Sequence, residues 1–267
     1  MINLKNGRKT IIGMVHTSAS PGTPNYSGNP AAIIEKAVAE AKQYEEAGFN
    51  AILIENMHDI PYLNREVGPE VVAILSAVAT NIKQHVKVPV GIQVLAGANK
   101  AALAIALASG LDFIRAEGFV FGHMADEGWM NSDAGELLRY RKQIGADHIQ
   151  VFTDIMKKHS SHQMTADLQL TDWIEAASFF KSDGIIITGS STGKEADHAQ
   201  VEQANKTTQL PILIGSGINA NNIETYWPFA DAFIIGSSIK EDGIWYNAIC
   251  PKRLNELIQK VAHLNNL

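Results

Sequence analysis

Short apolar segments alternate with longer helix candidates along the whole chain. Eight of the short segments are bounded by glycine, proline or polar residues, which is typical of strands buried on both faces. The predicted strands are Thr10–His16, Ala51–Glu55, Val90–Val94, Phe113–Arg115, Ile149–Asp154, Gly184–Thr188, Pro211–Gly215 and Ala232–Gly236. Proline at positions 30, 69 and 251 predicts helix starts between strands, and capping-box spacing adds two more starts, at Asp133 with Glu136 and at Asp172 with Glu175. Regular alternation of this kind predicts a parallel α/β fold.

Two architectures fit this alternation, a closed (β/α)₈ barrel and a doubly wound open sheet. No G-x-G-x-x-G opens the first unit, so a Rossmann dinucleotide site is not indicated. The chain has 267 residues, of which 46% are apolar, and a barrel of this kind typically takes about 250. We therefore predict one domain over residues 1–267, a (β/α)₈ TIM barrel of the phosphate-binding type.

The last two predicted strands each end in a turn of small residues. Glycine and serine there let the backbone turn sharply and direct successive N–H groups at an anion. The alternative is that both segments are only turns, but two of them at the end of a barrel fit its usual phosphate site. The predicted phosphate ligands are Gly215, Ser216, Gly217, Gly236, Ser237 and Ser238.

Polar residues cluster where the predicted strands end, and in a barrel those ends form the functional face. They include Asn56, His58, Asp59, Gln93, Glu117, Lys157 and Thr188. The catalytic candidates among them are His16, Glu55, Arg115, Asp154, Lys158 and His159. We expect Asp154 to act as general base or metal ligand, with Lys158 curling back over it if the turn between them is helical. Each residue taken singly also fits a structural role, such as an ion pair of Asp154 with Arg115.

Some reaction classes are less well supported by the residues. A Schiff-base aldolase needs a lysine facing the cavity, and the sixth strand, a common place for it, ends in Thr188. Met14-Val15-His16 offers only one imidazole, so the first strand lacks a His-x-His zinc pair. A divalent cation held by His16, Glu55 and Asp154 stays open, since these residue types suit Mg²⁺, Mn²⁺ or Zn²⁺.

Net charge and composition limit the classes of partner that we expect this protein to bind. A net charge of −6 and a pI near 5.8 argue against nucleic acid and against an anionic membrane surface. The most apolar helical stretch, Ala98 to Leu111, is too short to span a bilayer, and the N-terminus shows no secretory pattern. The lone Cys250 suits a reducing compartment, so we expect a cytoplasmic location.

Two loops are longer than a plain connection between strand and helix. The segment from Glu117 to Ser132 is rich in aromatic residues and fits a lid over the mouth, a packing flap or a contact in a homo-oligomer. The segment from Glu241 to Ala248 follows the eighth strand, where the short extra helix of a phosphate site often lies.

Several of these motifs together resemble the BtpA family. They are Gly13-Met14-Val15-His16, Ile54-Glu55-Asn56, Asp59-Ile60-Pro61-Tyr62, Phe113-Ile114-Arg115, Asp154 with Lys158-His159, Thr192-Gly193 with Asp197, Gly215-Ser216-Gly217 and Gly236-Ser237-Ser238-Ile239-Lys240. The resemblance covers nearly the whole chain and implies a TIM barrel of the phosphate-binding type, in a family without a settled reaction. Two places depart from the family pattern, Thr17-Ser18-Ala19-Ser20 and Met57-His58.

Two hypotheses for function follow. The first is an enzyme that acts on a small phosphorylated metabolite, a sugar or nucleoside phosphate, by acid–base chemistry of the isomerase, lyase or glycosidic-cleavage kind. The second is a non-catalytic assembly or regulatory factor that uses the barrel as an interaction surface. A mouth closed by side chains would favour the second.

Overall fold

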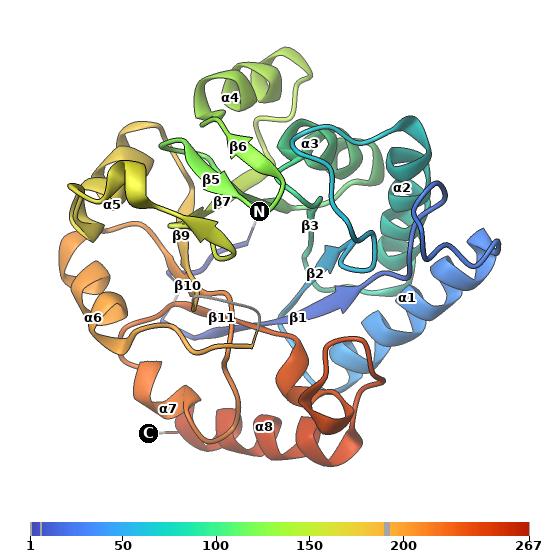
Figure 1. The fold of residues 1–267 in the computed structure, drawn as a ribbon. Coiled ribbons are helices and arrows are strands. Elements are labelled where there is room, and N and C mark those ends of the chain that lie inside the picture. Colours follow the sequence, from blue (N-terminus) through green and yellow to red (C-terminus); the bar gives the residue numbers. More distant parts are fainter. Residues whose placement is uncertain (1, 6, 190–192, 267) are drawn as a thin grey trace.

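Eight parallel strands form a closed barrel in the computed structural model, which describes residues 2–5, 7–189 and 193–266. The strands are β1 (Thr10–His16), β2 (Ala51–Glu55), β3 (Val90–Gln93), β4 (Phe113–Ala116), β7 (Gln150–Ile155), β9 (Gly184–Ile187), β10 (Ile212–Ile214) and β11 (Ala232–Ile235). Around the barrel their order is β1-β11-β10-β9-β7-β4-β3-β2, and every neighbouring pair is parallel (Figure 1). The predicted TIM barrel is confirmed, with strand ends shifted by at most one residue.

The strands are apolar on both faces because each face meets a different core. Alternate side chains, such as Ile12, Leu53 and Ile234, fill the barrel interior, while their neighbours pack beneath the helices. Within the interior Phe113 and Phe152 lie 5.5 Å apart, ring centre to ring centre. Gly91 makes room for Phe113, since a Cβ on Gly91 would lie 2.3 Å from that ring. Ile2 and Leu4 join the interior core, and Gln150 at the start of β7 accepts the Ile2 N–H, so these two residues cover the amino end of the barrel.

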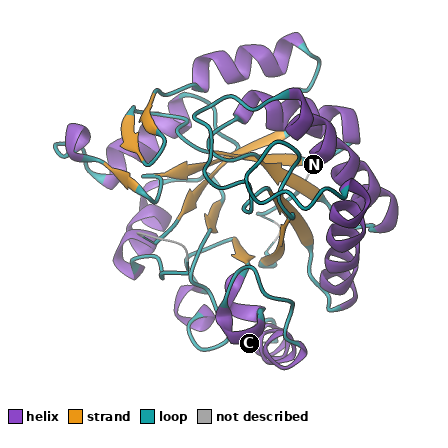
Figure 2. Ribbon diagram, turned by 45° about the vertical axis from the view of Figure 1, so that its right-hand side comes forward, coloured by secondary structure: helices purple, strands orange, loops and turns teal. Residues whose placement is uncertain are grey.

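Helices surround the strands on all sides (Figure 2). They are α1 (Pro30–Glu46), α2 (Pro69–His85), α3 (Asn99–Ser109), α4 (Ala134–Gln143), α5 (Leu170–Phe179), α6 (His198–Thr207), α7 (Ile223–Tyr226) and α8 (Pro251–Leu264). The starts expected at the three prolines are confirmed. The helix start expected at Asp133 is confirmed, because Asp133 is the N-cap of α4, but its carboxylate binds Arg65 and Asn99 and makes no capping box. The start expected at Asp172 is wrong, because α5 is capped by Gln169 and Asp172 is its third residue. None of the helices in the described ranges is long and apolar enough to cross a membrane.

The long segment after β4 folds into a hairpin, β5 (His123–Ala125) and β6 (Gly128–Met130). It pairs with β8 (Ser160–Ser161), which follows β7, in a small three-stranded sheet at the side of the mouth (Figure 1). Phe119 and Met130 at the ends of the segment are fully buried, whereas Met124 and Trp129 are about half exposed. The segment therefore combines a packed base, as the flap interpretation expects, with an exposed tip.

Candidate active site

Four of the six expected catalytic side chains are buried at the carboxyl ends of strands. His16 ends β1 and Glu55 ends β2, while Arg115 and Asp154 each lie one residue before the end of β4 and β7. Parallel strands bring these ends to one face of the barrel. The structure therefore brings together side chains that are up to 138 residues apart in the sequence, between His16 and Asp154.

His16 and Glu55 form one buried pair, with Nε2 of His16 3.4 Å from Oε2 of Glu55. Nδ1 of His16 lies 3.2 Å from the carbonyl oxygen of Trp245, so both ring nitrogens face oxygen acceptors. Burial raises the pKa of Glu55, but the hydrogen bond and charge of His16, with Lys158 and Arg115 beyond, outweigh it and lower that pKa to about 2. Glu55 is thus held as a carboxylate throughout the neutral range.

Arg115 and Asp154 form a second buried pair, in which Nε and Nη2 of Arg115 donate to the two carboxylate oxygens at 2.9 and 2.8 Å. This is the ion pair that the sequence left open as the alternative for Asp154. The expected helical turn from Asp154 to Lys158 is absent, because Met156 has φ of 53° and breaks it. Asp154 lines neither of the two cavities at the mouth, so its carboxylate holds Arg115 in place.

The three residues after this turn point in different directions. Lys157 is buried and pairs with Glu127 of the hairpin at 3.2 Å and with Glu117 at 3.9 Å. Lys158 lines both cavities, and burial, reinforced by the Arg115 charge, lowers its pKa. His159 is exposed at the edge of the second cavity. Adjacent residues on one strand end therefore have three separate environments.

Glu117 is a functional candidate that the sequence placed at the rim without a role. It is buried one residue beyond β4, and its Oε2 has no hydrogen-bond partner among the described residues. Burial raises its pKa to about 7, against the opposing charges of Lys157 and Arg115. A carboxyl group with a pKa near neutrality can both donate and accept a proton, and its position just after a strand was the available signal.

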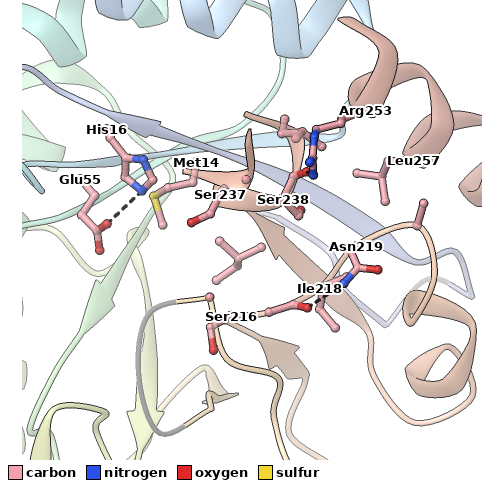
Figure 3. Close-up of a pocket in the computed structure, with 18 of the residues that line it drawn as sticks. Met14, His16, Glu55, Ser216, Ile218, Asn219, Ser237, Ser238, Arg253 and Leu257 are labelled. Atoms are coloured by element: carbon pink, nitrogen blue, oxygen red, sulfur yellow. Dashed lines mark hydrogen bonds and ion pairs between the residues drawn. The ribbon is translucent and has the colours of Figure 1, made fainter. Parts of the chain in front are cut away.

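The first cavity, of about 360 Å³, lies between the two glycine turns and the start of α8 (Figure 3). All six expected phosphate ligands line it. In the described part of the chain, the backbone N–H groups of Ser216, Gly217 and Ile218 have no acceptor, and neither has the buried hydroxyl of Ser238. The Ser216 hydroxyl is occupied, because it donates to the Lys194 carbonyl and accepts from the Gly189 N–H.

Arg253 and Asn219 also line this cavity, and the sequence did not single them out. Arg253 is the third residue of α8 and reaches the same side as Ser238, whose carbonyl oxygen lies 3.4 Å from Nη1 (Figure 3). The proline that opens α8 gave its position, but not the direction of its side chain. In the segment from Glu241 to Ala248, where an extra helix was expected, the structure has only one short 3₁₀ turn, Glu241–Gly243, and another 3₁₀ turn, Ser237–Ile239, precedes it. Thr192, part of the family motif, lies outside the described residues.

The second cavity, of about 410 Å³, joins the first at Glu55, Met57 and Lys158. Its walls are largely apolar and aromatic, including Tyr62, Leu95 and Trp245, with Glu117 and Glu127 at one side. The two segments that depart from the family pattern contact each other beside this cavity, through Thr17 and His58. Nδ1 of His58 donates to the Thr17 carbonyl oxygen at 2.7 Å, and the His58 ring lies 4.6 Å from that of Trp245. The mouth is therefore a continuous two-part space.

A metal centre is not formed by the expected residues. Among the residues that the structure describes, no three or more histidine, cysteine, aspartate or glutamate side chains converge on a point that could hold a cation. His16 and Glu55 pair with each other and Asp154 pairs with Arg115, so the three are not a common set of ligands.

Comparison with known proteins agrees with this architecture. Among solved structures, thiamine phosphate pyrophosphorylase from Pyrococcus furiosus has a TM-score of 0.59 at 12% identity, covering 98% of this chain and 99% of its own. Phosphoribosyl anthranilate isomerase from Thermus thermophilus has a TM-score of 0.59 at 13% identity, over 96% and 99%. At this identity the likeness concerns the fold.

Closer relatives are found by sequence. An uncharacterised mitochondrial protein of Caenorhabditis elegans is 41% identical over 99% of this chain and 96% of its own. The photosystem I biogenesis protein BtpA of Synechocystis is 34% identical over 94% of this chain and 88% of its own. The model of the BtpA family matches residues 7–263. The chain belongs to the BtpA family.

Proposed function

We propose that this protein is an enzyme that binds a small phosphorylated metabolite across the two cavities and transforms it by acid–base chemistry. The observation that carries the proposal is the open mouth of the barrel. It joins a cavity with unpaired backbone donors and Arg253 to one with a carboxyl group of near-neutral pKa. The described residues leave two cavities at the mouth. A mouth closed by side chains would have favoured the non-catalytic interaction factor instead.

Each part of the mouth has a role in this proposal. The glycine turns and Arg253 hold the phosphate, which places the rest of the substrate beside Lys158 and in the second cavity. Glu117 exchanges a proton with the substrate, because its pKa of about 7 suits both directions of transfer. Arg115, fixed by Asp154, and the His16–Glu55 pair supply fixed charges of both signs around the reacting atoms. The proposed class covers isomerases, lyases and enzymes that cleave glycosidic bonds.

The comparisons support this proposal at the level of analogy. The two solved structures have names that contain a phosphate or phosphoribosyl compound, on a barrel of the same architecture. We also propose a cytoplasmic location, supported by the lone cysteine, and no nucleic-acid partner, supported by the negative net charge.

Catalysis is tested by turnover. The purified protein is incubated with phosphorylated sugars and nucleoside 5′-phosphates, each beside its dephosphorylated form, and products are followed by NMR. We expect at least one phosphorylated compound to be converted and its unphosphorylated form to be spared. Equal conversion of a phosphorylated compound and its dephosphorylated form would contradict the proposal that the protein binds its substrate through the phosphate group.

Phosphate binding is tested with inorganic phosphate and isothermal titration calorimetry. Arg253→Ala is expected to weaken binding about tenfold, since it removes one charge-assisted hydrogen bond. Lys252→Ala is the matched control, because Lys252 is the exposed neighbour of Arg253 on α8 and does not line the cavity. Ser237→Asp is expected to weaken binding at least tenfold by bringing a like charge against the anion.

The choice of Ser237 avoids a backbone problem at the other turn. Gly217 has φ of 74°, and a Cβ there would lie 2.5 Å from the backbone of Glu195, so any substitution would move that loop. Equal phosphate affinity in Arg253→Ala, Ser237→Asp and the unmodified protein would place the anion elsewhere.

A further inference from the structure

We infer that the Lys158 amine is a nucleophile that forms an imine with the carbonyl carbon of a phosphorylated aldehyde or ketone. The phosphate on the carbonyl compound and the proton from Glu117 rest on the function proposed above, whereas the attack of Lys158 on the carbonyl carbon does not. Lys158 lines both cavities at their junction, so a ligand with phosphate at the glycine turns passes beside it on entering the second cavity.

Lys158 differs from the two buried lysines of the described chain, Lys157 and Lys240, in lacking a carboxylate partner. Lys157 pairs with Glu127, and Lys240 pairs with Glu40. No hydrogen bond or ion pair joins the Lys158 ammonium to another described residue. Among the nearby carboxylates, Glu55 is engaged by His16 and Asp154 by Arg115, while Glu117 lies 3.9 Å from the ammonium of Lys157.

A lysine held in this way favours the neutral amine. An ammonium group without a partner is costly to bury, and Arg115 adds a like charge beside it. Both effects lower the pKa of Lys158, against the attraction of Glu55, Asp154 and Glu117. Only the unprotonated amine attacks a carbonyl carbon, so the surroundings increase the reactive fraction near neutral pH.

The proposed step balances without a further reactant. The amine nitrogen attacks the carbonyl carbon, and the carbonyl π electrons move to oxygen, which takes up the proton that the nitrogen releases, giving a neutral carbinolamine. Glu117, which lines the second cavity together with Lys158, can protonate this hydroxyl, so that water leaves and a protonated imine remains. The imine nitrogen then withdraws electrons from a bond next to the former carbonyl carbon, which suits a lyase or isomerase.

The location explains why the sequence argued against this chemistry. The expectation followed the sixth strand, which carries Thr188 beyond its end. In the structure the lysine comes instead from the end of the fifth barrel strand, β7. The backbone at Met156, with its positive φ, separates Lys158 from Asp154.

The experiment traps the imine by reduction. The protein is mixed with glyceraldehyde 3-phosphate and sodium cyanoborohydride, and modified lysines are mapped by peptide mass spectrometry. We expect Lys158 to be modified at least tenfold faster than any other lysine, and faster by glyceraldehyde 3-phosphate than by glyceraldehyde. Lys157→Arg is the matched control and keeps the adduct, whereas Lys158→Arg loses it with its circular dichroism unchanged.

The outcomes separate this inference from the proposed phosphate site. Equal, selective labelling of Lys158 by both aldehydes, without protection by inorganic phosphate, supports the imine and overturns the phosphate site. Phosphate binding that depends on Arg253, with Lys158 modified no faster than surface lysines by either aldehyde, overturns the imine. Adduct formation in Lys158→Arg at the unmodified rate overturns it as well.

Discussion

Replacing Asp154 with asparagine is expected to lower the free energy of unfolding by about 3–5 kcal/mol, because the Arg115 guanidinium stays buried and loses its carboxylate. Both side chains are almost fully buried, 1% and 2% exposed, and their contact is bidentate. Glu55 also attracts Arg115, which offsets part of the loss. Urea unfolding followed by circular dichroism measures the change.

Two variants identify the cause. Asp147→Asn breaks the exposed pair with Lys142, and we expect it to change stability by less than about 1 kcal/mol. The double variant Arg115→Met, Asp154→Asn is expected to recover part of the loss, since it removes the unpaired charge itself. If Asp154→Asn is as stable as the unmodified protein, Asp154 does not hold Arg115 and its role as a general base gains support.

The barrel was predictable because its signal is local. Each strand shows as a short apolar run, and the rule that parallel strand ends share one face then located His16, Glu55, Arg115 and Asp154. The partner of Asp154 stayed open between Arg115 and Lys158, because the choice depends on one backbone angle after β7. With Met156 at positive φ, Lys158 turns away from Asp154, and residue spacing carries no sign of that angle.

Side chains that reach the site from outside the strand ends were also missed. Arg253 enters from α8, which lies beside the last strands only after the barrel has closed. The pKa of Glu117 reflects burial from several elements at once, and a sequence gives no measure of burial at a loop position. The strand ends therefore predicted which residues lie at the mouth of the barrel. The directions of their side chains and their protonation states could be read only from the folded structure.

Stability should fall as the pH rises from about 4.5 to 7 through the ionisation of Glu117. Its pKa is raised from 4.5 to about 7 in the folded protein, so in this window the folded state keeps a proton that the unfolded state has released. The cost at pH 8 is roughly 3 kcal/mol, since each tenfold difference in proton affinity between the two states corresponds to about 1.4 kcal/mol. Glu117→Gln cannot ionise, so its stability relative to the unmodified protein is expected to increase by about 2.5 kcal/mol between pH 5 and pH 8, because part of the cost is already present at pH 5.

The comparison must be made between variants, because other groups titrate in the same window. Burial lowers the pKa of His123 to about 4, which makes stability rise with pH, and burial raises that of Asp133 to about 6, which makes it fall. Both contributions cancel in the difference. Glu136→Gln is the control, since the hydrogen bond from Lys100 lowers the pKa of this exposed carboxylate and its effect lies below pH 4.5. Urea unfolding at four pH values measures the difference. A flat difference for Glu117→Gln, like that for Glu136→Gln, would mean that Glu117 is ionised throughout and cannot donate the proton that the proposed chemistry requires.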